Sequence, residues 1–112
     1  MTDGGETTGT EEGWHRVAAT DEVPDGGAIM VDAGGRAIAL THFEGQYGAL
    51  DNACPHMGGP LGQGVIEFGF LVCPWHGREY HPLTGACEGY EEAVATYPVE
   101  VRDDGIYVRV EG

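Results

Sequence analysis

Short runs of alternating apolar and polar residues, separated by glycine-rich turns, make up most of the chain after residue 13. Alternation with a period of two places successive side chains on opposite faces of a β-strand, and it is clearest in residues 106–110. The pattern predicts an all-β sandwich of short antiparallel strands, because no segment shows the periodicity of a long helix. The strands are expected at 28–32, 36–43, 46–51, 64–67, 70–73, 78–81, 95–103 and 106–110.

Expected turns, one helical turn and a disordered tail complete this prediction. Glycine-containing turns are expected at 33–35, 44–45 and 104–105. Thr20 is expected to cap one helical turn over 21–23, which Pro24 ends. Residues 1–13 are rich in Gly, Thr and Glu and lack apolar periodicity, so they are predicted to form a disordered acidic tail ahead of one domain at 14–112.

The composition of the chain bears on its partners through its net charge. The 112 residues carry a net charge of −14, and all five cationic residues are arginine. Such a surface repels nucleic acid and anionic membranes and favours a basic partner. The acidity fits either a docking surface for a redox partner or a general adaptation for solubility, including life at high salt.

Cysteine content and hydropathy bear on the compartment. Three cysteines, without an apolar signal segment or a run of the roughly 20 apolar residues that a membrane helix needs, predict a reduced, cytoplasmic location without a membrane anchor.

Two short Cys/His stretches hold the candidate chemistry. Cys54-Pro55-His56 and Cys73-Pro74-Trp75-His76 are separated by residues 57–72, and both fall on predicted loops at hairpin tips. Two thiolates and two imidazoles are strong ligands for a metal centre. A structural Cys₂His₂ zinc site is one interpretation, although zinc fingers usually pair Cys with Cys and His with His. A disulfide between Cys54 and Cys73 in metal-free protein is another, but it leaves the two histidines unexplained.

The C-x-H and C-x-x-H stretches, with their CPHMGG and CPWHG contexts, resemble the Rieske ferredoxin family. The resemblance extends over roughly 14–110 and includes VPDGG, LTG and YPVEV. It implies a Rieske-like antiparallel β-sandwich whose cluster-binding subdomain consists of two hairpin-tip loops. One [2Fe–2S] cluster per chain is then held by Cys54, His56, Cys73 and His76, with Gly58, Trp75, Gly77 and Tyr80 around these ligands.

The resemblance also implies a function. Such a protein is a one-electron carrier, not an enzyme, that passes electrons from a flavin-dependent NAD(P)H reductase to a terminal oxygenase or a similar acceptor. The alternative is a small Rieske subunit of a nitrite-reductase-like or other larger enzyme, with a regulatory or redox-sensing role.

Departures from high-potential members of the family indicate a low-potential protein. The two loop cysteines that form a disulfide in those proteins match Gly59 and Trp75 here, and a serine that bonds a bridging sulfide matches Arg78. Tyr80 keeps a hydroxyl that could bond a cysteine sulfur. Fewer hydrogen bonds leave more charge on sulfur and lower the potential.

Residues beside the ligand loops predict a docking site. An exposed apolar rim is expected from Met57, Pro60, Leu61, Pro74 and Trp75, with Trp75 either as the main contact or packed inward as cover for the cluster. Cys87 is expected to be a small core residue, and a redox-active or dimer-forming thiol is the alternative. His42 and His81 are expected to be structural or at the surface.

Overall fold

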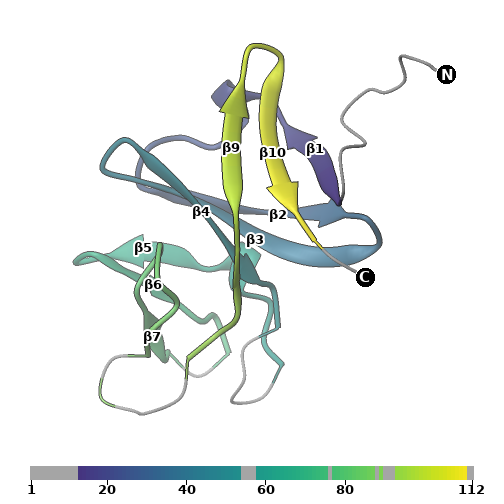
Figure 1. Ribbon diagram of the computed structural model, residues 1–112. Helices are drawn as coiled ribbons and strands as arrows, with labels where there is room; N and C mark the ends of the chain where they lie inside the picture. The colour runs from purple at the N-terminus through teal and green to yellow at the C-terminus, as the bar shows by residue number, and fades with distance from the viewer. Residues whose placement is uncertain (1–12, 54–57, 76, 88, 90–92, 111–112) are drawn as a thin grey trace, which may run out of the picture.

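The computed structural model describes residues 13–53, 58–75, 77–87, 89 and 93–110. Its strands form three antiparallel sheets (Figure 1). The first has the order β1 (Trp14–Ala18), β10 (Gly105–Arg109) and β9 (Val99–Arg102). The second joins β2 (Gly27–Ala33), β3 (Arg36–Phe43), β4 (Gln46–Asp51) and β8 (Thr96–Tyr97). The third contains β5 (Val65–Glu67), β6 (Phe70–Val72) and β7 (Glu79–Tyr80).

Most of the predicted strands are confirmed, with two corrections to the strands and one to the helical turn. Strand β1 was not predicted, although it pairs with β10 from the other end of the chain. The strand predicted at 95–103 is divided into β8 and β9 by Pro98, which has no N–H to donate to a ladder. The short 3₁₀ helix Thr20–Glu22 is also present, but Thr20 does not cap it. Ala19 occupies the capping position, and its N–H donates to Glu22 Oε1 at 2.8 Å.

The four-stranded sheet is the centre of the fold, because it is buried on both faces. Residues 38–41 of β3 are all fully buried. Ile38 and Leu40 pack into the core shared with the β1-β10-β9 sheet, whereas Ala39 packs into a second core beneath the β5-β6-β7 sheet. Since successive side chains alternate across a strand, one strand supports both halves of the molecule.

A buried polar contact fixes the segment after β7, which follows the β5-β6-β7 sheet, to the four-stranded sheet. The Thr41 hydroxyl donates to the Pro82 carbonyl oxygen at 2.7 Å, which satisfies a polar group that would be costly to bury alone. Gly48 lies opposite Thr41 in the ladder, where a Cβ atom would come within 2.6 Å of the same carbonyl oxygen. The segment after β7 therefore lies directly against the central sheet.

The helices among the described residues are three-residue 3₁₀ turns, Thr20–Glu22 and Leu61–Gln63, and neither could cross a membrane.

Candidate metal centre

Cys73 lies at the end of β6, in a loop closed by two backbone hydrogen bonds. Its N–H donates to the Arg78 carbonyl oxygen at 2.8 Å, and its own carbonyl oxygen accepts from the Gly77 N–H at 2.9 Å. Gly77 has φ of +78°, a conformation that glycine adopts without steric cost. The thiol is buried, with 3% of the residue exposed. Strand β6 and this tight turn thus hold one thiol at a defined place inside the protein.

The first Cys/His stretch belongs to a loop that is closed at its base. Ala53 and Pro60 form an isolated antiparallel bridge, and the Leu61 N–H donates to the Asn52 carbonyl oxygen at 2.8 Å. The Asn52 side chain also accepts from the Gly62 N–H at 2.7 Å. Cys54 and His56 fall between these two anchors, and both lie outside the described residues, as does His76 of the second loop. Asn52 was not predicted as a site residue, although Asn is common where a side chain replaces a backbone partner in a turn.

The two loops touch at Gly59. A Cβ atom on Gly59 would lie 2.7 Å from Cys73 Sγ and 3.1 Å from Trp75 Cγ. Only a residue without a side chain allows so close an approach. Of the four predicted ligands, Cys73 alone is described, and the structure places it against the loop that carries the other Cys/His pair.

The predicted apolar rim is confirmed at some positions and wrong at one. Trp75 is 56% exposed and Pro74 is exposed, whereas Pro60 is half-buried. Leu61 does not belong to the rim, because it is completely buried in the core with Leu50 and Leu71. Met57 lies outside the described residues. The base of Trp75 packs on Gly59 while much of its side chain faces solvent, so it is not wholly buried as a cluster cover.

Tyr80 and Cys87 are buried in the same core as Cys73. Tyr80 is completely buried, and its backbone forms an isolated antiparallel β-bridge with that of Cys87, which is 5% exposed. Both belong to the core cluster that contains Cys73. The interpretation of Cys87 as a core residue is therefore confirmed, while the bond from the Tyr80 hydroxyl to a cysteine sulfur stays a prediction. Gly58 is exposed with φ of +78°, at the edge of the first loop.

His81 has a structural role. Its Nδ1 atom accepts hydrogen bonds from the N–H groups of Leu83 at 3.1 Å and Thr84 at 3.2 Å. Both bonds need Nδ1 unprotonated, and they close the turn that follows β7. His42 is structural as well, since its Nδ1 atom lies 2.8 Å from the Val23 carbonyl oxygen and its ring stacks on Tyr47.

Replacing His81 by alanine should leave the cluster in place while lowering the stability of the protein. Two backbone N–H groups lose their acceptor, at a net cost of about 1 kcal/mol per hydrogen bond. Visible absorption should keep its shape and intensity per protein, and the midpoint of thermal unfolding should fall. Loss of the visible absorption in the His81→Ala protein would contradict this assignment and make His81 part of the metal centre.

Comparisons with known proteins agree with this geometry. Residues 13–99 match the family described as the Rieske [2Fe-2S] domain. A relative from Photorhabdus laumondii, the 3-phenylpropionate/cinnamic acid dioxygenase ferredoxin subunit, is 36% identical over 84% of this chain and 91% of its own length. The ferredoxin component of naphthalene 1,2-dioxygenase/salicylate 5-hydroxylase systems from a Ralstonia species is 29% identical over 89% of this chain and 98% of its own.

Solved structures show the same likeness. The ferredoxin of carbazole 1,9a-dioxygenase from Nocardioides aromaticivorans superposes with a TM-score of 0.76 at 27% identity, over 86% of this chain and 96% of the other. Dicamba monooxygenase superposes with a TM-score of 0.77 at 29% identity, but the match covers only 33% of that longer chain. The fold therefore occurs both as a whole small protein and as one part of a larger one.

Proposed function

Because this chain belongs to the Rieske [2Fe-2S] domain family and carries its cluster, we propose that it is a one-electron carrier that passes electrons from a flavin-dependent NAD(P)H reductase to a terminal oxygenase. The observation that carries the proposal is the meeting of the two loops at Gly59, which brings the buried Cys73 thiol against the loop with the other Cys/His pair. The relatives named as ferredoxin components match over nearly their full length, which supports a carrier in place of a catalytic subunit.

We assign the cluster to Cys54, His56, Cys73 and His76. The described part of the site fits such a group, since Cys73 offers a buried thiol in a loop whose backbone bonds are already made. A cluster held by two cysteines and two histidines takes up one electron at a higher potential than an all-cysteine cluster, because imidazole donates less charge than thiolate. Gly58, Gly77 and Tyr80 are proposed to surround these ligands, with small residues leaving room for backbone N–H groups near sulfur.

The structure supports assignment to the low-potential class. Gly59 and Trp75 are in contact, at the two positions where high-potential relatives would have a disulfide. Here the base of an indole ring packs on a glycine, so the contact between the loops is non-covalent. Arg78 occupies the place of a hydroxyl donor and its backbone carbonyl closes the Cys73 turn. We therefore expect a reduction potential in the lower part of the Rieske range of about −150 to +300 mV.

The cofactor and the transfer function can be tested on the purified protein. It should contain iron and acid-labile sulfide in equal amounts, and it should give a rhombic EPR signal when reduced. Added flavin reductase with NADH should reduce the cluster, and a terminal oxygenase should reoxidise it. Zinc in place of iron would overturn the assignment of the cofactor, whereas a reducible cluster that exchanges no electron with either partner would favour the regulatory subunit.

Trp75 is the proposed contact for the acceptor. It is 56% exposed beside the ligand loop, and large exposed aromatic rings carry much of the binding energy in small interfaces. Trp75→Ala should lower the second-order rate of electron transfer to the oxygenase by about tenfold, equivalent to roughly 1.4 kcal/mol, at low salt. The rate is measured by stopped-flow absorption of the cluster.

Phe68 supplies a matched control for that experiment, because it is 96% exposed and lies at the β5–β6 turn, away from the Cys73 loop. Phe68→Ala should leave the rate unchanged. A Trp75→Ala protein that loses its visible absorption would show that Trp75 shields the cluster, and the docking assignment would then be wrong.

A cytoplasmic location is part of the same proposal. Cys87 is a buried thiol in the core, which suits the reduced interior of a cell.

A further inference from the structure

Three of the five arginines lie on the outer face of one sheet. On β1 and β10, Trp14 pairs with Arg109 and Arg16 pairs with Tyr107. Side chains directly opposite each other in an antiparallel ladder share a face, and the neighbouring Ile106 and Val108 point the other way, into the core. Glu100, which lies opposite Tyr107, and Arg102 of β9 complete the group. We call this set the arginine face, and its members are Trp14, Arg16, Glu100, Arg102, the largely buried Tyr107 and Arg109.

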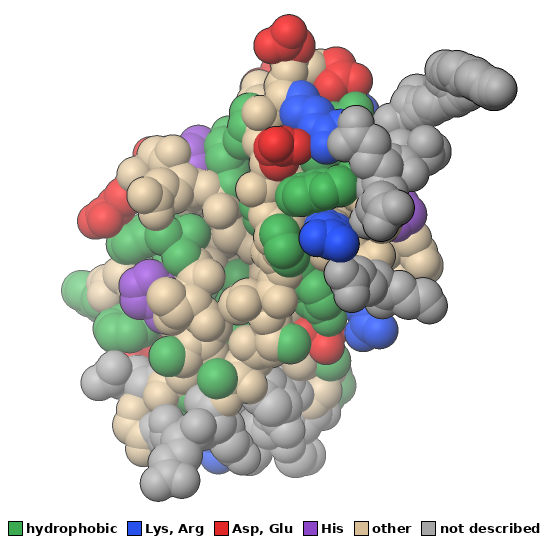
Figure 2. Space-filling model, viewed as in Figure 1, with side chains coloured by type: hydrophobic (Ala, Val, Ile, Leu, Met, Phe, Trp, Pro, Cys, Tyr) green, Lys and Arg blue, Asp and Glu red, His purple; other side chains and the backbone are tan. Residues whose placement is uncertain are grey.

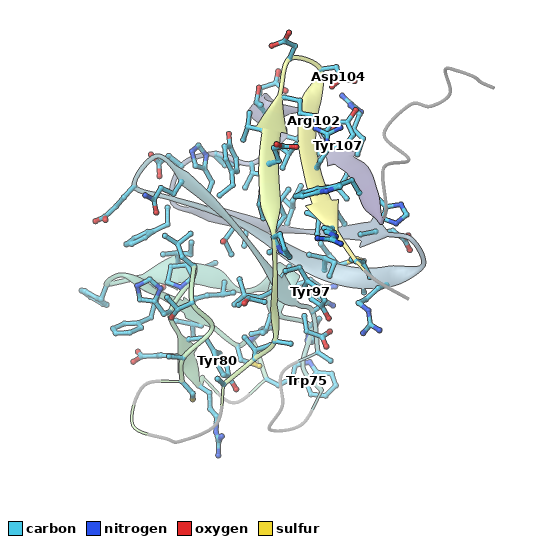
Figure 3. All side chains as sticks on the ribbon, viewed as in Figure 1. Trp75, Tyr80, Tyr97, Arg102, Asp104 and Tyr107 are labelled. Atoms are coloured by element: carbon cyan, nitrogen blue, oxygen red, sulfur yellow. The ribbon has the colours of Figure 1, made fainter. Side chains whose placement is uncertain are left out.

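The arginine face is held in place by specific contacts. The Arg102 guanidinium lies over the Tyr107 ring at 4.1 Å and over the Trp14 ring at 5.6 Å. It also forms an ion pair with Glu100 at 2.7 Å. Figure 3 shows Arg102, Asp104 and Tyr107 together near the β9–β10 turn, at the opposite end of the molecule from Trp75. The surface is therefore separate from the proposed docking site for the oxygenase.

Asp104 organises the same end of the sheet. Its carbonyl oxygen accepts from Arg16 Nε at 2.7 Å, and its carboxylate accepts from the Tyr107 hydroxyl at 3.0 Å. The hydrogen bond to Asp104 raises the pKa of Tyr107 above its ordinary value, and the Asp104 carboxylate that accepts this bond is a negative charge beside the arginines.

The chemistry of the arginine face suits carboxylates. Arginine forms paired hydrogen bonds with carboxylates, and Trp, Tyr and Arg are the residues that dominate protein-binding surfaces. The face stands out in a chain with 19 acidic residues and a net charge of −14. Figure 2 shows cationic side chains beside both apolar and acidic ones on this part of the molecule.

We propose that the acidic segment formed by residues 1–12 of the same chain docks on the arginine face. This segment contains Asp3, Glu6, Glu11 and Glu12 and no Lys or Arg. The three arginines of the face outnumber the carboxylates of Glu100 and Asp104 beside them, so the face stays positive and its charge is complementary to that of the segment. It is covalently joined to the face, because Gly13 leads directly into β1. A tethered segment has a high effective concentration, in the millimolar range for short links, which compensates for weak individual contacts.

Gly13 joins the segment to the sheet that carries this face. The Gly13 carbonyl oxygen accepts from the Val110 N–H at 2.9 Å, next to the Trp14–Arg109 pair. Gly13 has φ of +89°, where a Cβ atom would come within 2.7 Å of the Val110 carbonyl oxygen. Glycine adopts this conformation without steric cost. Glu11 and Glu12 immediately precede Gly13 in the sequence.

The segment is also long enough to reach across the arginine face. The three strands of the sheet span about 10 Å from β1 to β9 at the usual strand spacing. Twelve residues can extend to about 40 Å, so Glu6 and Asp3 can reach Arg16 and Arg102 even along a folded path. The segment needs no secondary structure of its own, which agrees with its lack of apolar periodicity.

The test compares two variants of the full-length protein with the same net charge of −11. In one, Glu6, Glu11 and Glu12 become glutamine; in the matched control, Asp21→Asn, Glu44→Gln and Glu67→Gln neutralise three exposed carboxylates elsewhere. Nitrogen-15 NMR follows the Trp14 indole N–H, the Arg102 Nε–H and the backbone mobility of residues 2–12. Each exposed ion pair changes a population ratio by roughly twofold, so the first variant should lower the docked-to-undocked ratio about eightfold.

Four outcomes decide the proposal. Support requires that the Trp14 and Arg102 signals shift and that residues 2–12 become more mobile in the tail variant but not in the control. A synthetic peptide of residues 1–12, added to the tail variant, should shift the same signals back. Equal spectra for wild type and both variants would overturn the proposal. If the peptide binds the wild-type protein as tightly as it binds the tail variant, the proposal is also overturned, since the face would then be open to an external acidic partner.

Discussion

Replacing His76 by alanine is expected to abolish the [2Fe–2S] cluster. His76 is proposed to supply one of two imidazole bonds to one iron, and a histidine ligand cannot be replaced by a methyl group. The protein should be isolated without the red-brown colour, with iron and sulfide well below one cluster per chain. The loss should be measured by metal and sulfide analysis and by the EPR signal after reduction. His56→Ala is expected to behave in the same way.

His81 provides the matched control for this experiment, because it is a histidine five residues further along that accepts hydrogen bonds from Leu83 and Thr84. His81→Ala should retain the cluster. A His76→Ala protein with full iron and sulfide content and an unchanged EPR signal would show that the assignment of ligands is wrong. Cysteine in place of His76 is a further check, since an added thiolate should retain a cluster and lower its potential.

The sequence predicted the central strands well because their signals are local. Strand β3 was predicted with its observed bounds, since Ala33-Gly34-Gly35 and Glu44-Gly45 mark both ends and apolar residues fill the middle. Strand β1 was missed, because it is defined by pairing with β10, about 90 residues away, and not by a strong alternation of its own. The break at Pro98 could have been predicted, because proline cannot donate to the ladder.

The site was predicted from its motif, whereas its surroundings depend on packing. Leu61 follows the ligand loop and was expected at the surface, but it is buried in the core with Leu50 and Leu71. The neighbouring Gly62 lies directly against Met30 of β2, where a Cβ atom would come within 2.7 Å of the Met30 Cβ atom. Nothing in the local sequence reveals that contact. The bond from Thr41 to Pro82 is equally non-local, since it joins β3 to the segment after β7.

Gly59→Ala is expected to remove most of the cluster without changing a ligand. Its added Cβ atom would lie 2.7 Å from Cys73 Sγ, closer than real Cβ atoms approach other atoms, and 3.1 Å from Trp75 Cγ. The sulfur cannot move away easily, because the Cys73 backbone is fixed by hydrogen bonds with Gly77 and Arg78. Forcing an extra carbon into such a contact usually costs about 1–3 kcal/mol. The two loops should separate, and the half-life of the visible absorption in air should shorten at least about tenfold, which corresponds to roughly 1.4 kcal/mol.

The neighbouring Gly58 separates steric from backbone effects. Gly58 has φ of +78°, and no described residue lies within 4 Å of an added Cβ atom, so Gly58→Ala introduces backbone strain of about 1 kcal/mol without a collision among the described residues. The Gly58→Ala protein should retain its cluster. The double variant Gly59→Ala with Trp75→Ala removes the contact with the ring but keeps the contact with Cys73 Sγ. If cluster loss in Gly59→Ala arises at the sulfur, the double variant stays defective. Recovery of the cluster in the double variant would place the critical contact at Trp75 and would show that the indole ring sets the spacing of the two loops.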